Sequence, residues 1–315
     1  MKKHRIILLT AICCVILAAC GNEEQDAAET SDIAVDQSAF ENKVPEIDVE
    51  ITETEPDSEP IYADGTEIGL DESWQYAEES AIHTGSAVFY AATDNRNGIV
   101  VAVNAGHGTE GGTKVKTYCH PDHSAKTTGG STAEGATQAT AVSAGTTFTD
   151  GTPEATVTLQ EAKLVRDKLL AAGFDVLMLR DGEDVQLDNV ARTVIANNVA
   201  DCHIAIHWNG DDATSPEGVF YIRVPDAIKG MEPVASYYKQ HDALGQALVD
   251  GLVSVGNSTF SGGSMAIDLT QTSYSTIPSV DVELGNQCSD HSQATLDNLA
   301  DGIVLGVEEF FSEAD

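Results

Sequence analysis

Across residues 98–311, short apolar runs alternate with longer amphipathic segments. Short β-branched runs bounded by turn residues indicate buried strands, and apolar residues at helical spacing indicate helices. The expected strands are 98–104, 174–179, 202–207, 218–224, 265–269 and 279–284, and the expected helices are 155–172, 187–195, 237–255 and 296–310. Strands that alternate with helices imply a single α/β domain with a largely parallel, twisted sheet covered by helices on both faces.

The first nineteen residues have the pattern of an export signal, with three basic residues followed by an apolar run, Ile7–Ala19. This run is shorter than the ~20 residues of a permanent membrane span. It ends in Leu17–Gly21, which resembles the lipobox of bacterial lipoproteins and implies lipid attachment at Cys20. The alternative is an ordinary signal peptide cut near Ala19. With a lipidated Cys20 we expect an extracytoplasmic protein anchored to the bacterial cell membrane, because two acyl chains suffice for stable anchoring.

Residues 20–71 are acidic and poor in aromatic residues, which predicts a disordered linker that acts as a spacer or, alternatively, as a binding segment. Residues 72–315 are then expected to form the folded domain. The formal net charge of −35 argues against nucleic acid as a partner, because phosphates would be repelled. Outside the export signal only Cys119, Cys202 and Cys288 remain, an odd set that does not indicate a disulfide framework, although one bridge stays open.

Four polar side chains stand at the ends of expected strands or at a helix start: His107, Glu154, His207 and Glu283. Two histidines and one carboxylate, with a fourth position open to water, form a common catalytic zinc site. A second carboxylate beside the ion can serve as general base. The chain order places all four at element ends, so they can converge on one rim of the sheet.

The same segments resemble the zinc-dependent N-acetylmuramoyl-L-alanine amidases of the amidase_3 type, over about residues 98–311. That family has a Gly-His-Gly-Gly loop after its first strand, a Glu before its first helix, a Ser-Ile-His-Ala-Asn strand and a Pro-x-Val-Leu-Val-Glu-x-Gly strand. The matching segments here are Gly106–Thr109, Pro153–Leu159, Ala200–Asn209 and Pro278–Gly285, joined by Gly173–Asp181 and Arg192–Asn197.

The resemblance implies that His107, Glu154 and His207 bind Zn²⁺ and that Glu283 is the catalytic carboxylate. The implied substrate is peptidoglycan, and the bond is the amide between N-acetylmuramic acid and the L-alanine of the stem peptide. Two other readings remain. One is an inactive wall-binding or regulatory lipoprotein on the same scaffold, and the other is a zinc hydrolase acting on a different substrate.

The chain departs from the family pattern at Thr109, at Asn286 and in the segment 109–151, which is longer than the usual connection between the first two ligands. This segment is rich in Gly, Thr, Ser and Ala and shows little periodicity, so we expect a long loop. It either lies over or beside the cleft and limits access, or is a passive surface loop.

Other polar residues near these motifs are also candidates for a role in the site or in the core. His203 lies four residues from His207 on the same strand, roughly 13 Å away, so both cannot bind one ion, and we expect His203 to pack in the core. Cys119, His120 and His123 are an alternative second metal site. Asp281 should share a strand face with Glu283 and contact either substrate or a ligand.

Overall fold

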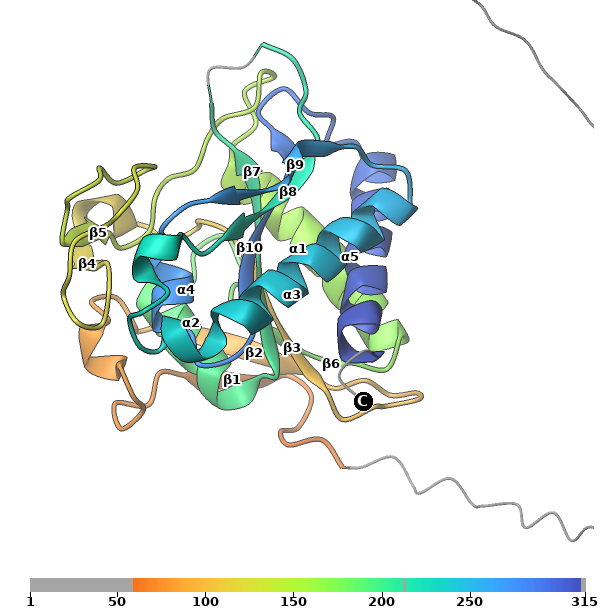
Figure 1. Ribbon diagram of the computed structural model, residues 1–315. Helices are drawn as coiled ribbons and strands as arrows, with labels where there is room; N and C mark the ends of the chain where they lie inside the picture. The colour runs from red at the N-terminus through yellow and green to blue at the C-terminus, as the bar shows by residue number, and fades with distance from the viewer. Residues whose placement is uncertain (1–58, 212–213, 313–315) are drawn as a thin grey trace, which may run out of the picture. The chain divides into compact units, whose positions relative to one another are not determined.

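Four parallel strands form the centre of the molecule, and each coincides with an apolar run of the sequence (Figure 1). The computed structural model describes residues 59–211 and 214–312. Across the sheet the central strands are β6 (Asp175–Met178), β3 (Val100–Ala105), β7 (Cys202–Asn209) and β10 (Ser279–Asn286). All six residues of β3 are buried because both faces of the sheet are covered, which explains its almost continuous apolar sequence.

Two pairs of strands extend this centre to the full order β1-β2-β6-β3-β7-β10-β8-β9. On one side, β2 (Ser86–Tyr90) and β1 (Thr66–Gly69) are antiparallel to their neighbours. On the other side, β8 (Val219–Arg223) is antiparallel to β10, and β9 (Thr259–Ala266) is parallel to β8. The predicted α/β domain with a largely parallel sheet is therefore confirmed.

The predicted end of the linker at residue 71 is wrong, because β1 belongs to the sheet. Ile68 of β1 is only 8% exposed and packs with Phe89 of β2. The acidic composition concealed this edge strand, in which only one residue points inward. The predicted signal peptide, Cys20 and the linker as far as residue 58 lie outside the described residues.

Helices cover the two faces of the sheet unequally (Figure 1). The first face carries α1 (Glu154–Ala171), α3 (Val234–Ser254) and α5 (Gln293–Ser312), which bury the larger apolar core with alternate residues of the central strands. The second face carries α2 (Asn189–Val199) and the short α4 (Thr270–Tyr274), with a smaller core. Short 3-10 turns occur at η1 (Ala77–Glu79) and η3 (Asp226–Ile228). In the described part of the chain, none of the helices has the length and apolarity needed to cross a membrane.

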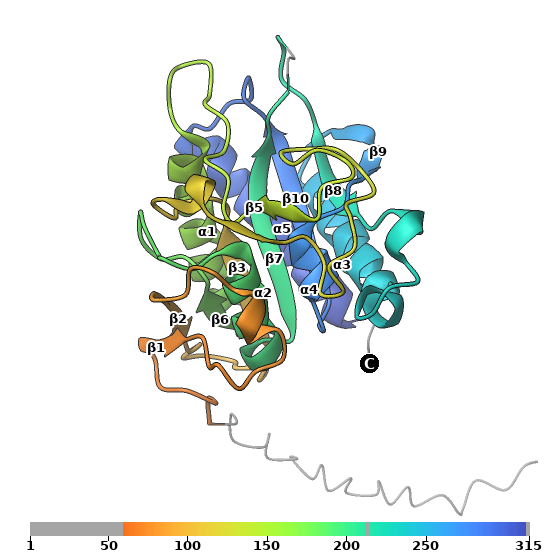
Figure 2. The ribbon, with the colours of Figure 1, turned by 90° about the vertical axis from the view of Figure 1, so that its left-hand side faces the viewer.

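The segment 109–151, called the insertion below, lies on the second face, in front of β7 and β10 in Figure 2. It contains one 3-10 turn, η2 (Gly112–Lys114), and a small antiparallel pair, β4 (Lys116–Tyr118) and β5 (Gln138–Thr140), so the expectation of a plain loop was incomplete.

The insertion is fixed to the domain through Asp268, which follows β9. The Asp268 carboxylate pairs with His120 Nε2 at 2.8 Å and accepts hydrogen bonds from Thr127, while Lys126 Nζ donates to the Asp268 backbone carbonyl. Because His120 and Asp268 are fully buried, this anchor holds the insertion against the domain as a fixed layer.

Candidate active site

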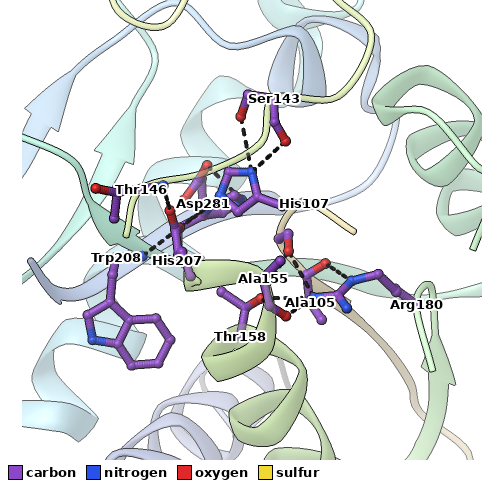
Figure 3. A network of polar contacts seen from close by, with 12 residues as sticks. Ala105, His107, Ser143, Thr146, Ala155, Thr158, Arg180, His207, Trp208 and Asp281 are labelled. Atoms are coloured by element: carbon purple, nitrogen blue, oxygen red, sulfur yellow. Dashed lines mark hydrogen bonds and ion pairs between the residues drawn. The ribbon is translucent and has the colours of Figure 1, made fainter. Parts of the chain in front are cut away.

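Three predicted ligands meet at the carboxyl edge of the central strands (Figure 3). His107 follows β3, Glu154 is the first residue of α1, and His207 lies near the end of β7. Glu154 Oε1 is 2.8 Å from His107 Nε2 and 3.1 Å from His207 Nδ1, and these two nitrogens are 3.1 Å apart. The structure thus brings together side chains separated by up to 100 residues.

Two buried guanidinium groups hold the loop that carries His107. Arg180 donates to the carbonyl oxygens of Ala105 and Gly106 at 3.0 and 2.9 Å (Figure 3). Arg192 donates to the carbonyl oxygen of His107 at 2.7 Å. His107 itself has a φ of 66°, a left-handed conformation that costs energy for a residue with a side chain, and these bonds hold it there.

The insertion contributes directly to the placement of two ligands. The carbonyl oxygen and the hydroxyl of Ser143 each lie 3.0 Å from His107 Nδ1. The backbone N–H of Thr146 donates to Glu154 Oε2 at 2.7 Å. Between them, Gly145 has a φ of 80°, and a Cβ there would stand 2.7 Å from His107 Cδ2 and 2.9 Å from Glu154 Oε2. The insertion is therefore part of the site, which excludes the passive surface loop.

Strand β10 presents Asp281 and Glu283 on the same face of the sheet as His207. In the parallel register of β10 and β7, Glu283 pairs with His207 and Asp281 pairs with Ala205. Glu283 Oε2 and Asp281 Oδ1 are buried and have no hydrogen-bond partner in the structure. Asp281 Oδ2 lies 3.8 Å from His207 Nε2.

The pKa values of the three ligands follow from their mutual contacts. Burial lowers the pKa of His107, against the opposing effect of Glu154. Burial also opposes ionisation of Glu154, but hydrogen bonds with His107 and His207 outweigh it and hold the Glu154 pKa well below its usual range. Burial disfavours a charged His207, yet the neighbouring carboxylates, led by Asp281, raise the His207 pKa to about 10. The ionised Glu154 carboxylate therefore lies beside a proton on His207, and a cation that bound here would replace this proton.

The pKa of Glu283 is shifted in the direction opposite to that of Glu154. Burial, followed by the negative charge of Asp281, raises the Glu283 pKa well above its usual value. A carboxylate with a raised pKa is a stronger proton acceptor near neutral pH, which is what a general base needs.

These groups open into one cleft of about 840 Å³. Its floor carries the three ligands together with Asp281 and Glu283, and one wall is formed by the insertion. The other wall comes from Ile267 and Leu269 after β9 and from Thr270 and Gln271 at the start of α4. A cleft of this size accommodates a ligand much larger than water.

The donor set and its spacing fit a zinc ion. Zinc bound at 2.0–2.2 Å by two imidazoles and a carboxylate requires donor atoms that are roughly 3.3 Å apart. The three donor atoms here are 2.8–3.1 Å apart, so a small outward movement accommodates the ion. Within residues 59–211 and 214–312, this is the single group of three or more His, Cys, Asp or Glu side chains close enough to share one ion.

The other candidates have structural roles. His203 is fully buried and lies 3.2 Å from the Asn104 amide, and burial lowers its pKa to about 3, so it packs in the core as expected. His120 binds Asp268, and His123 stacks on Tyr118, so the alternative metal site at Cys119, His120 and His123 does not form. Cys119 and Cys202 are free thiols, so the structure contains no bridge from Cys119 to Cys288.

Sequence reasoning missed the residues that hold the ligands. Arg180 and Arg192 were matched as motif positions without a role, and Ser143 and Thr146 were not identified. A sequence signal existed only for the arginines, because a charged residue inside an apolar pattern indicates a buried polar network.

Known proteins resemble this chain in sequence and in fold. The family model described as Amidase_3, N-acetylmuramoyl-L-alanine amidase, matches residues 101–307. A comparison with curated protein sequences found no match.

Solved structures with a similar fold include three amidases. The N-acetylmuramyl-L-alanine amidase Ami1 of Mycobacterium smegmatis has 21% identity and a TM-score of 0.57, covering 70% of this chain and 100% of that chain. The apo form of Ami1 from Mycobacterium abscessus has 22% identity and a TM-score of 0.53, covering 68% and 99%. An N-acetylmuramoyl-L-alanine amidase of Clostridium difficile 630 has 20% identity and a TM-score of 0.50, covering 69% and 98%. At these identities the similarity establishes the fold, whereas the family model matches more than half of the sequence, and the chain belongs to the Amidase_3 family of N-acetylmuramoyl-L-alanine amidases.

Proposed function

We propose that this chain is a zinc-dependent hydrolase that cleaves the amide bond between N-acetylmuramic acid and L-alanine in peptidoglycan. The observation that carries the proposal is the convergence of His107, Glu154 and His207 within bonding distance of one ion, beside Glu283 in an open cleft. Family membership supplies the substrate class.

Each residue would have a defined role. His107 Nε2, Glu154 Oε1 and His207 Nδ1 would hold the ion, which when bound polarises the amide carbonyl and acidifies water. Glu283 takes a proton from the attacking water as the new carbon–oxygen bond forms. It then delivers that proton to the alanine nitrogen as the carbon–nitrogen bond breaks, so that a lactyl carboxylate and a free amino terminus result.

We further propose that lipidation of Cys20 confines the enzyme to the outer surface of the cell membrane, with the acidic linker as its tether. The anchor then raises the local concentration of the enzyme at the membrane-proximal wall. Substitution Cys20→Ala should release the protein from the membrane fraction while leaving hydrolysis of isolated wall unchanged. Retention of the variant in washed membranes would contradict the anchor.

The inactive-scaffold alternative is disfavoured because all three ligands and Glu283 are in place. Digestion of purified peptidoglycan by the full chain, followed by mass analysis, tests the proposal directly. Fragments with a new L-alanine amino terminus should be released, and a chelator should stop their release.

Two variants complete this experiment. Glu283→Gln should keep the metal and lose at least about 10²-fold in turnover, the usual contribution of a general base. Glu217→Gln removes a carboxylate from the nearby β7–β8 connection and should behave as wild type. Release of fragments with a different amino terminus would favour the other-substrate reading, and no release by a metal-loaded protein would favour the inactive scaffold.

A further inference from the structure

The two histidine ligands present different ring nitrogens to the shared centre. His107 offers Nε2, and its other nitrogen, Nδ1, is occupied by Ser143. His207 offers Nδ1, so its Nε2 points away from the other ligands. A histidine that binds a metal through one nitrogen carries a proton on the other, and that N–H needs an acceptor.

The acceptor available to His207 is Asp281. Its Oδ2 atom lies 3.8 Å from His207 Nε2, whereas its Oδ1 atom has no hydrogen-bond partner. The side chain is largely buried, with a residue exposure of 9%, in a cleft that contains mostly acidic and neutral groups. A buried carboxylate without a donor is costly, and His207 is the donor that the structure places beside it.

We propose that Asp281 is a positioning residue that accepts a hydrogen bond from His207 Nε2 and so directs His207 Nδ1 toward the metal. This inference rests on the proposed metal centre. The present separation exceeds a hydrogen bond, and a small tilt of the imidazole toward Asp281 closes it.

The proposed role belongs to this sequence in particular. The strand pattern that Pro278–Gly285 resembles has Leu at the position of Asp281. A leucine side chain cannot accept a hydrogen bond, so it could not take this role. Asp281 adds one negative charge next to the ion and makes the bound imidazole more basic, and both effects strengthen metal binding.

The test measures zinc affinity of the purified full chain by competition with a chromophoric chelator. Asp281→Leu should weaken zinc binding by about 10- to 100-fold, the usual cost of removing such a partner. Asp281→Asn keeps an acceptor oxygen and should fall between Asp281→Leu and wild type. Asp211→Asn removes the same charge from the rim of the same cleft and should leave the zinc affinity within about twofold of wild type.

A second measurement separates positioning from a general structural effect. Cobalt(II) in place of zinc gives visible absorption bands that report ligand geometry. Asp281→Leu should change these bands, with a partial return toward the wild-type spectrum in Asp281→Asn. The melting temperatures of the metal-free variants show whether each chain folds. If Asp281→Leu does not fold, the zinc affinity and the cobalt spectrum of Asp281→Asn test the role.

These measurements separate a failure of the positioning role from a failure of the proposed function. Zinc binding by wild type with equal affinities for Asp281→Leu and Asp211→Asn overturns the positioning role alone. A wild-type chain that binds no zinc overturns the metal centre and this inference together. A loss of affinity confined to the Asp281 variants, with altered cobalt bands, supports the role.

Discussion

Arg192 shows how a single buried residue that is not a predicted ligand can determine the geometry of the site. Its guanidinium donates to Asn104 Oδ1 at 3.0 Å and to the carbonyl oxygens of Ala105 and His107 at 3.2 and 2.7 Å. Burial lowers its pKa to about 9, so it remains charged at neutral pH. The planar Arg192 guanidinium thus connects the end of β3 to His107, the first predicted ligand.

Replacement of Arg192 by lysine should therefore impair the metal centre. A lysine carries one compact ammonium group and cannot bridge these separated acceptors. We expect a loss of about 2–4 kcal/mol in the free energy of unfolding, because buried acceptors lose their donor, together with weaker zinc binding. Chemical denaturation and chelator competition measure the two effects. Arg166→Lys, at the partly exposed Asp181 contact, is the matched control, and equal losses in both variants would contradict the assignment.

For single residues, the sequence predicts which side chains come together at the site but not which residues hold them in position. His107, Glu154, His207 and Glu283 were predictable because metal and acid–base chemistry restricts the residue types, and a family pattern places them. Thr146 acts through its N–H group, and Ser143 acts through its carbonyl oxygen as well as its hydroxyl. Every non-proline residue has these backbone groups, so their role depends mainly on where the backbone runs, which the sequence does not indicate.

At the scale of elements, the insertion is the least predictable part of the fold. Its low periodicity indicated a loop correctly, but its position depends on long-range contacts to Asp268 and to the two ligands. The hypothesis that it limits access to the cleft stays a prediction, although it lines one wall. By contrast, α1, α3 and α5 were predicted closely, because a helix that covers a sheet repeats its apolar residues at fixed spacing.

Gly145 provides a test of the insertion as a structural support. In Gly145→Ala, the added methyl group would collide with His107 and Glu154, and the left-handed backbone would be strained. Zinc affinity and hydrolysis should both fall by about tenfold or more, as expected when a supporting contact shifts the ligands. Gly135→Ala is a matched control, with a φ of 83° but no atom within 4 Å of the new Cβ. If both variants lose the same amount, backbone strain alone is responsible.

Helix α1 carries a buried carboxyl group whose effect depends on pH. Neither oxygen of Glu161 has a hydrogen-bond partner, and burial, followed by the charge of Asp297 on α5, raises the Glu161 pKa well above its usual value. Between the unfolded and folded pKa values the native state holds the extra proton. The free energy of unfolding therefore decreases as the pH rises through this window.

Glu161→Gln should remove this dependence. The variant should match wild type near pH 4 and become more stable than wild type as the pH rises, by about 1.4 kcal/mol for each unit of pKa shift that is removed. Thermal melts of both proteins from pH 4 to pH 9 give the difference. A constant offset between the two curves would contradict a protonated Glu161 in the folded protein.

At the scale of the whole molecule, metal binding should couple the insertion to the rest of the domain. The three ligands come from β7, the loop after β3 and α1, and two of them contact the insertion. Removal of zinc with a chelator should lower stability by about 2.7 kcal/mol relative to protein in zinc at 100 times the dissociation constant. Calorimetry measures the loss, and protease cleavage within residues 109–151 should accelerate. Unchanged cleavage would show that the insertion is held by Asp268 alone.

The pairing of β7 with β10 has a consequence for how this active site can change during evolution. Neighbouring strands lie about 4.8 Å apart, and the hydrogen-bonded register sets His207 opposite Glu283. The separation between His207, a proposed ligand, and Glu283, the proposed proton acceptor, is thus set by peptide geometry and not by the side chains around it. Loops and cleft walls can diverge without changing this separation, whereas a shift of one residue between these two backbones would turn Glu283 to the opposite face of the sheet.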